Sequence, residues 1–258
     1  MTEHVLIEKA GGVLTLTLNR PEKKNALTGD MYGALGDAID GAGDDPDVRC
    51  VLIQANGDMF TAGNDLGSFA AANSGEAPKG DRRGGSALIQ ALGRAKTPVV
   101  AAVNGRAVGV GVTMLLHCDL VFLAEDALLT TPFVNLALVP EAASSILLPA
   151  RIGHARAFSM FVLGEAVDAR KAEAWGLANA VVPAGELRAR ARAAAEAIAA
   201  KPPSAVAITK ALMRDSARLL ERMQEEGGHF AAQLKTAEAK EAFAAFAEKR
   251  APDFSKVA

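Results

Sequence analysis

The clearest pattern of apolar and polar positions is the strict alternation over Val13–Leu18, VLTLTL. A period of two predicts a strand, here with the leucines on one face. A strand-like run at residues 48–53, apolar except for Arg49, and continuous apolar runs at Val99–Val103 and at residues 120–123 predict three further strands. These four segments are the expected framework of a sheet.

Helical patterns separate these strands. Thr28 is a candidate N-cap, because Met31, Leu35 and Ile39 follow it at the spacing of one helix face. Strands and helices alternate in this way to about residue 195, which predicts an α/β fold with mainly parallel strands. From residue 186 onward the pattern is almost entirely helical, interrupted by Pro202-Pro203-Ser204.

The C-terminal helices carry more apolar side chains than isolated helices would need. These residues are Leu212, Leu219, Leu220, Met223, Phe230, Leu234, Phe243 and Phe246. They either pack only on the rest of their own chain or also contact neighbouring subunits. We favour the second interpretation, a homo-oligomer, because three helices have little else to cover.

Composition and charge exclude several classes of protein. The chain has 28 Lys and Arg against 30 Asp and Glu, a formal net charge of −2, which argues against a nucleic-acid-binding protein. The amino terminus has early charges and no long apolar region, so no secretory signal is predicted. The most apolar stretch, residues 108–124, is too short and too polar to span a bilayer. Together these features predict a cytoplasmic protein.

Cysteine and histidine usage argues against a disulfide framework and a metal site. Cys50 and Cys118 both lie in apolar runs and are expected to be small buried residues in a reducing compartment. The four histidines have no metal-ligand spacing, so no metal is expected.

A glycine turn, Gly109-Val110-Gly111, follows the strand Val99–Val103 and precedes an apolar helix. Backbone N–H groups at such a helix start have no intrahelical acceptor and can hold an anion or a developing oxyanion. The turn is not a dinucleotide fingerprint, because Met114 occupies the place of the third glycine. A glycine turn that serves packing alone is the simpler alternative.

Residues 130–145, TTPFVNLALVPEAASS, contain one charged side chain, the carboxylate of Glu141. This glutamate is either a solvated loop residue or a buried base. Burial disfavours the charged form and raises the pKa, which suits a general base that works near neutral pH. Ser144 and Ser145 lack a GxSxG motif, so we expect them to be helix N-caps.

Several segments, taken in order, resemble the crotonase superfamily, the coenzyme A thioester enzymes of the enoyl-CoA hydratase/isomerase type. The matching segments are NRPEKKNAL (residues 19–27), FTAGNDL (60–66), AAVNGRAVGVGVTMLLHCD (101–119), the Glu141 segment, LGEAVDARKAEAWGLANAVVP (163–183) and KPPSAVAITKALM (201–213). The resemblance covers nearly the whole chain. It implies a spiral of repeated ββα turns over residues 1–195 and a helical C-terminal module over residues 196–258, which supports a homotrimer or a dimer of trimers.

The resemblance also implies an acyl-CoA substrate, with coenzyme A as part of the substrate and no separate cofactor. The backbone N–H groups of Asn64 and Val110 would form the oxyanion hole. The positions implied for CoA binding are Lys23, Lys24, Ala26, Ala62, Lys249 and Arg250. The last two would reach the phosphates, from the same subunit or from a neighbouring one. The alternative is that this basic pair is ordinary solvated surface.

The reaction is indicated by three positions. Similar hydratases use two glutamates to activate water, and Thr113 and Phe133 occupy those positions here, which argues against hydration. The segment TPFVNLALVPEAASSILLP resembles Δ3,Δ2-enoyl-CoA isomerases of fatty acid β-oxidation, in which the glutamate of PE-x-x-SS is the base. Glu141 is therefore the expected catalytic residue. Two alternatives stay open: an enoyl-CoA hydratase or another crotonase-type reaction on a specialised acyl-CoA, and a non-catalytic acyl-CoA-binding subunit.

The acyl group is expected to contact Phe69, Thr113, Phe133 and Leu136. Residues 70–85, AAANSGEAPKGDRRGG, are small, polar and rich in glycine. They are either a mobile loop beside the acyl chain or a plain surface insertion.

Overall fold

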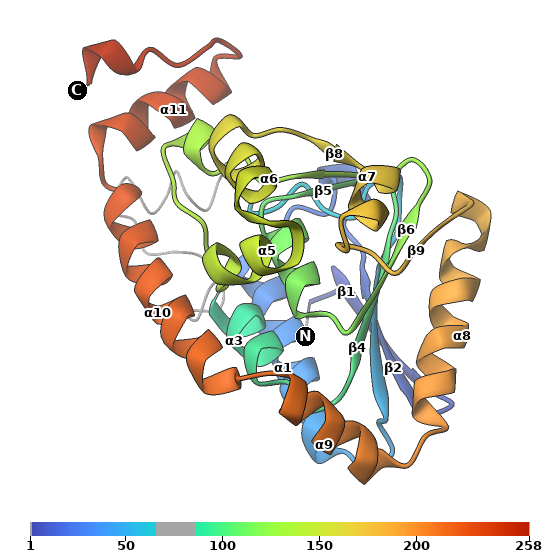
Figure 1. The fold of residues 1–258 in the computed structure, drawn as a ribbon. Coiled ribbons are helices and arrows are strands. Elements are labelled where there is room, and N and C mark those ends of the chain that lie inside the picture. Colours follow the sequence, from blue (N-terminus) through green and yellow to red (C-terminus); the bar gives the residue numbers. More distant parts are fainter. Residues whose placement is uncertain (1, 66–85, 258) are drawn as a thin grey trace.

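A six-stranded sheet forms the centre of the computed structural model, which describes residues 2–65 and 86–257 (Figure 1). The strand order is β1-β2-β3-β4-β6-β9. The strands are β1 (Val5–Ala10), β2 (Val13–Leu18), β3 (Cys50–Ala55), β4 (Val99–Val103), β6 (Leu120–Ala124) and β9 (Ala180–Val182). Only the β1–β2 pair is antiparallel, so the predicted α/β fold with mainly parallel strands is confirmed.

A three-stranded sheet contains β5 (Arg106–Val108), β7 (Leu128–Thr130) and β8 (Val167–Asp168). The chain passes from β4 of the large sheet to β5 of the small one and then into α4 (Val110–Thr113). It repeats this path from β6 to β7 and on to α5 (Ser144–Ile152). The predicted spiral of ββα turns is therefore confirmed.

Helices cover both faces of the large sheet. On one face α8 (Leu187–Ala199) packs against β2, β3, β4 and β6, and on the other lie α1 (Gly29–Asp44) and α3 (Ser86–Arg94). All six residues of β2 are buried as a result, although its alternating pattern alone would allow one solvated face. Thr15, on the α8 face, accepts a hydrogen bond from Arg192 at 3.4 Å.

The remaining helices follow the spiral or form the C-terminal region. The short ones are Pro21–Lys23, Met114–His117, Val134–Leu136, α6 (His154–Phe158), a π-helix at Ser159–Leu163, α7 (Ala169–Ala174), Ala184–Glu186 and Phe254–Lys256. The C-terminal ones are α9 (Pro203–Met213), α10 (Ser216–Gln233) and α11 (Ala237–Ala247), which run along one side of the molecule (Figure 1). α10 packs against α3. A division at residue 195 falls within α8, and the two-domain organisation stays a prediction.

The structure tests the predicted helix cap, one predicted strand and the expected burial of the two cysteines. Thr28 accepts a hydrogen bond from the Met31 N–H at 3.4 Å and caps α1, as expected. The strand predicted at residues 48–53 instead spans Cys50–Ala55, because the Val48 N–H bonds to Asp45 O in a turn. Cys50 and Cys118 are buried free thiols, as predicted.

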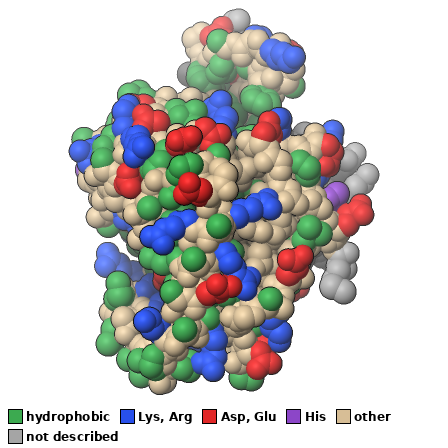
Figure 2. Space-filling view, turned by 90° about the vertical axis from the view of Figure 1, so that its right-hand side faces the viewer, with side chains coloured by type: hydrophobic (Ala, Val, Ile, Leu, Met, Phe, Trp, Pro, Cys, Tyr) green, Lys and Arg blue, Asp and Glu red, His purple; other side chains and the backbone are tan. Residues whose placement is uncertain are grey.

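The surface over α8 carries charges of both signs. Figure 2 shows Lys and Arg side chains interspersed with Asp and Glu side chains on this face, without a continuous basic surface. No helix in the described ranges is long and apolar enough to cross a membrane.

Candidate active site

Two chain segments meet where Asn64 and Val110 lie. Thr61 and Ala107 form a parallel bridge, and the Val108 N–H donates to Thr61 O at 3.1 Å. The approach requires glycines. A Cβ on Gly63 would lie 2.9 Å from Val108 O, and one on Gly111 would lie 2.4 Å from the Thr61 methyl group. The sequence therefore brings the segments before Asn64 and around Val110 into direct contact.

The backbone N–H groups of Asn64 and Val110 have no acceptor among the described residues. Val110 is the first residue of α4, where the N–H has no intrahelical partner. Gly109, before it, has φ 56° and ψ −115°, a conformation that favours glycine. Because α4 has four residues, the local N–H groups rather than a long helix dipole provide the positive charge.

Glu141 is linked by a hydrogen bond to Thr113, which lies in the same short helix as Val110. The Thr113 hydroxyl donates to Glu141 Oε1 at 2.5 Å. Burial raises the pKa of Glu141 to about 7, the Thr113 hydrogen bond lowers it, and the negative charge of Glu226 raises it. Glu141 is thus a partly buried carboxylate, and its raised pKa suits a general base that works near neutral pH.

Tyr32 is a buried residue of this site that the sequence analysis missed. Its hydroxyl donates to the side-chain oxygen of Asn64. Burial, and secondarily the charge of Glu141, raise the pKa of Tyr32 well above its usual value. Tyr32 therefore remains a neutral donor that orients Asn64 and lies within electrostatic reach of Glu141.

The turn after Glu141 depends on two more residues that the sequence analysis did not assign. Glu226 accepts hydrogen bonds from the N–H groups of Ala143 and Ser145, and His117 bonds to Ala142 O. The expectation that Ser144 and Ser145 cap α5 with their hydroxyls is wrong. Ala143 occupies the N-cap position without a side-chain hydrogen bond.

The expected acyl-pocket residues are placed differently from one another. Thr113 is fully buried and hydrogen-bonded to Glu141. Phe133 is also buried, with the centroid of its ring 6.0 Å from that of Phe161. Leu136 is partly buried at the edge of the core. Phe69 and the loop at residues 70–85 lie outside the described residues.

The loop that contains Lys23, Lys24 and Ala26 is hydrogen-bonded to the oxyanion segment, the stretch of chain from Ala62 to Asn64. The Ala62 N–H donates to Lys24 O at 2.9 Å, and Asn25, fully buried, donates to Asn56 O and Met59 O. Lys24 also forms an exposed ion pair with Asp58 at 2.8 Å. Four of the six predicted CoA-binding positions therefore lie in one connected cluster.

Lys249 and Arg250 lie directly after α11, in another part of the chain. Arg250 bonds to Glu241 at 2.5 Å and to Glu248 at 2.6 Å. Its charge is thus already compensated within α11 and the turn that follows.

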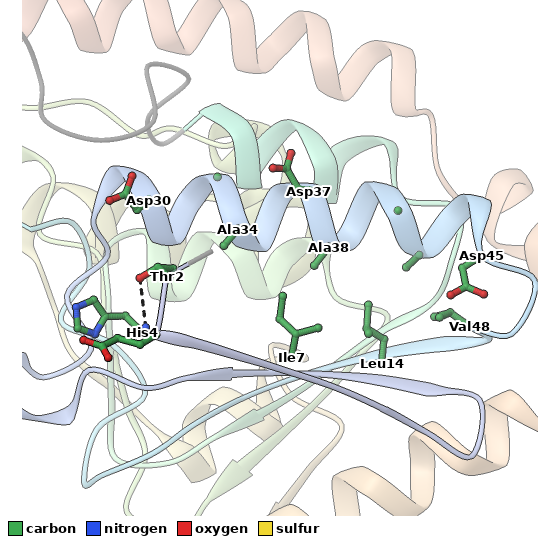
Figure 3. Close-up of a pocket in the computed structure, with 14 residues that line it drawn as sticks. Thr2, His4, Ile7, Leu14, Asp30, Ala34, Asp37, Ala38, Asp45 and Val48 are labelled. Carbon is green, nitrogen blue, oxygen red and sulfur yellow. Dashed lines mark hydrogen bonds between the residues drawn. The ribbon is translucent and has the colours of Figure 1, made fainter.

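A groove of about 1090 Å³ lies apart from Glu141, between α1 and the β1–β2 hairpin (Figure 3). Ile7, Leu14 and Ala38 form apolar parts of its wall, and Asp30, Asp37 and Asp45 contribute carboxylates. It contains none of the residues that the sequence analysis assigned to the reaction.

The family of the chain follows from comparison with known proteins. The model of the enoyl-CoA hydratase/isomerase family matches residues 8–257. The chain belongs to this family, and the predicted crotonase superfamily is confirmed.

Individual relatives agree on this family but not on one reaction. The chain is 32% identical to 1,2-epoxyphenylacetyl-CoA isomerase of Escherichia coli over 99% of both chains. It is 36% identical to enoyl-CoA delta isomerase 2 of Rattus norvegicus over 81% of this chain and 54% of that protein. Other relatives are called enoyl-CoA hydratase and carnitinyl-CoA dehydratase.

A solved structure agrees with the fold over the full chain. The enoyl-CoA hydratase/isomerase of Pseudoalteromonas atlantica superimposes with a TM-score of 0.91 at 43% identity and covers 98% of this chain and 100% of that one. The protein is therefore a hydratase/isomerase-type enzyme of the crotonase fold.

Proposed function

We propose that the protein is a Δ3,Δ2-enoyl-CoA isomerase in which Glu141 is the single proton carrier. The observation that carries the proposal is the position of this carboxylate, hydrogen-bonded to Thr113 one turn after Val110, with its pKa raised to about 7. The likeness to enoyl-CoA delta isomerase 2 supports the same reaction.

The reaction moves a double bond from C3=C4 to C2=C3 of the acyl group. Glu141 removes a proton from C2, and the electron pair of that C–H bond delocalises into a dienolate. The thioester oxygen then accepts hydrogen bonds from the Asn64 and Val110 N–H groups. The carboxyl returns the proton to C4, so atoms and charge balance without water or a cofactor.

The neighbouring groups favour isomerisation over hydration. Adding water needs a second acid or base to position the water and deliver its proton. Glu226 is the second carboxylate near Glu141, but both of its oxygens accept backbone N–H groups. Thr113 donates its hydroxyl to Glu141, and Phe133 is packed against Phe161.

The CoA moiety is proposed to bind along Lys23, Lys24, Ala26 and Ala62, with Lys249 and Arg250 at the phosphates. The proposal is supported by the hydrogen bond between Ala62 and Lys24, which joins the oxyanion segment to a basic loop. For Arg250, binding requires exchange of its carboxylate partners for phosphate.

Assembly as a trimer or a dimer of trimers is part of the proposal. Exposed apolar side chains on α9 and α11 support it, since such surfaces commonly mark interfaces. These residues are Ile208, Leu212, Met213 and Phe246, with Leu212 84% and Met213 83% exposed. Sedimentation-velocity analysis would test it, and a monomer at micromolar concentration would contradict it.

The reaction is tested by incubating the purified protein separately with 3-hexenoyl-CoA and 2-hexenoyl-CoA and following the products by mass spectrometry. Isomerisation converts the 3-enoyl ester at unchanged mass and adds no water to the 2-enoyl ester. Glu141→Gln should abolish this conversion while CoA binding, measured by calorimetry, stays close to that of the wild type.

Other outcomes identify the alternatives. Addition of water to the 2-enoyl ester would identify a hydratase and would mean that the argument from Thr113 and Phe133 is wrong. CoA binding without either reaction would favour another acyl-CoA substrate or a non-catalytic subunit. Full activity of Glu141→Gln would remove Glu141 from the mechanism.

A further inference from the structure

The backbone immediately after Glu141 adopts an unfavourable conformation. Ala142 has φ 64° and Ala143 has φ 55°, so two consecutive alanines occupy the left-handed region. Each such residue costs about 1 kcal/mol or more relative to the right-handed region. Both alanines are buried, with 3% and 0% exposure. Contacts from elsewhere must therefore hold this turn and, with it, the position of Glu141.

Glu226, on α10, makes the first of these contacts. Its carboxylate accepts the Ala143 N–H at 2.5 Å and the Ser145 N–H at 3.0 Å, one on each oxygen. The Glu226 residue is only 5% exposed. Charge-assisted hydrogen bonds of this kind are shorter and stronger than those between neutral groups. They satisfy N–H groups at the start of α5 in place of a serine N-cap.

His117 and Arg214 make the second contact. His117 Nε2 lies 2.7 Å from Ala142 O, and Arg214 donates to His117 Nδ1 and to His117 O. An arginine only donates, so Nδ1 is the acceptor and Nε2 carries the proton that bonds to Ala142 O. Arg214 thus fixes the tautomer of His117, and His117 holds the turn at Ala142 O. Glu226 holds the same turn at the N–H groups of Ala143 and Ser145.

We propose that Glu226 is a positioning residue for Glu141, through which α10 holds the 141–145 turn and sets both the orientation and the electrostatic environment of the base. The proposal rests on the proposed role of Glu141. The His117–Arg214 pair holds the same turn from the opposite side, so the C-terminal helical region takes part in building the active site of its own chain.

The effect of Glu226 on the pKa of Glu141 depends on the groups that surround Glu141. Thr113 on α4 donates a hydrogen bond to the carboxylate, and Tyr32 on α1 and Glu226 on α10 interact with it electrostatically. Arg222, one turn earlier on α10, partly offsets the charge of Glu226. Because Glu226 is negative, it opposes ionisation of Glu141, and removing its charge should lower the pKa of the base. A residue with a purely structural role would change the melting temperature but not this pKa.

The central variant is Glu226→Gln, which keeps the shape of the side chain but removes its charge and one of its two acceptors. Either Ala143 or Ser145 then faces an amide NH₂ group and the turn loosens. Glu226→Asp keeps the charge on a shorter side chain and is the second variant should the glutamine variant not fold. Glu221→Gln, which removes an exposed carboxylate from the same helix, is the matched control.

Two measurements test the proposal, and only one requires turnover. The carboxyl carbon of Glu141 is titrated by ¹³C NMR of glutamate-labelled protein, with its signal assigned from Glu141→Gln. Glu226→Gln should shift its midpoint to lower pH, whereas Glu226→Asp and Glu221→Gln should leave it near the wild-type value. If the protein shows no isomerase activity, this titration still decides whether Glu226 acts on Glu141.

With 3-hexenoyl-CoA, Glu226→Gln and Glu226→Asp should lower kcat about ten- to a hundredfold with little change in KM, because small displacements of a catalytic group reduce rates on this scale. The pH midpoint of kcat should fall only in Glu226→Gln. An unchanged Glu141 titration in folded Glu226→Gln would overturn the proposal. If only Glu226→Asp folds, wild-type kcat in that variant would overturn it.

Discussion

The Thr113 hydroxyl donates a hydrogen bond to Glu141 Oε1 across 2.5 Å. This contact joins the short helix that begins at Val110 to the turn that carries the base. It also favours the ionised carboxylate and so counteracts part of the effect of burial, which raises the pKa of Glu141. A threonine at this position therefore tunes the pKa of the proposed base instead of acting as an acid or base itself.

Replacing Thr113 by valine should raise the pKa of Glu141 above its present value of about 7. Since a general base must be deprotonated, the acidic limb of the pH profile of kcat/KM should move to higher pH. Activity at pH 7 should fall severalfold and recover at higher pH. Thr113→Ser retains the hydroxyl and is the matched control, with a midpoint close to that of the wild type. The same midpoint in both variants would contradict this role for the hydroxyl.

Glu141 should lower the stability of the folded protein above neutral pH. Its folded-state pKa of about 7 exceeds its ordinary value of 4.5, so between these pH values the folded protein retains a proton that the unfolded chain has lost. The stability associated with the neutral carboxyl is therefore lost as the pH rises through this window. At pH 8, Glu141→Gln should be more stable than the wild type by about 1–3 kcal/mol.

Urea unfolding of both proteins at pH 8 and pH 4 would measure this difference. At pH 4 the carboxyl is neutral in both states, so the two proteins should have similar free energies of unfolding. A glutamine variant that is less stable at pH 8 would show that Glu141 is stabilised as an anion, contrary to its raised pKa.

The sequence predicted those features of the fold and the site that have local signals. Alternation identified Val13–Leu18, and a single carboxylate in an uncharged stretch identified Glu141. Glu226 also had a local signal, because it follows Leu219 and Met223 at the spacing of the buried stripe of α10. A carboxylate in such a stripe requires a buried partner, and this reasoning could have found it.

Other contacts had no local signal. Tyr32 lies on the buried side of α1 like any core residue, and only the tertiary structure brings its hydroxyl to Asn64. The left-handed turn at Ala142 and Ala143 could not be predicted either, because glycine rather than alanine is typical of that conformation. Its conformation is imposed by Glu226 and His117, which come from distant parts of the chain.

The backbone N–H of Val110, the proposed oxyanion donor, can be removed by substituting proline for Val110. Val110 is the first residue of α4, a position where proline is tolerated because its missing N–H has no intrahelical partner. Val110→Pro should therefore keep the fold and lower kcat about 10²–10³-fold, which corresponds to about 2.7–4 kcal/mol for one oxyanion donor.

Val110→Ala keeps the N–H and loses part of the buried side chain, and it is the control for packing. Its kcat should stay well above that of the proline variant. Near-UV circular dichroism would verify that both variants are folded. Equal loss of kcat in the two variants would mean that the Val110 side chain, not its N–H, matters.

His117 should make stability depend on pH in the acidic range. Burial and, secondarily, the charge of Arg214 lower the pKa of His117 to about 3, from an ordinary value of 6.5. Between these pH values the unfolded chain binds a proton that the folded protein excludes. Stability should therefore fall with decreasing pH from about 6.5 to 3, by about 1.4 kcal/mol per pH unit from this residue alone.

His117→Gln removes the titrating group but keeps a donor for Ala142 O, so its free energy of unfolding should fall less steeply over the same range. His229→Gln, at an exposed position on α10, is the matched control and should keep the wild-type slope. Urea unfolding at half-unit intervals between pH 4 and 7 would measure the three slopes. If His117→Gln and the wild type have parallel curves, then His117 is protonated in the folded protein, and its Nδ1 cannot accept the hydrogen bond from Arg214 that fixes the turn beside Glu141.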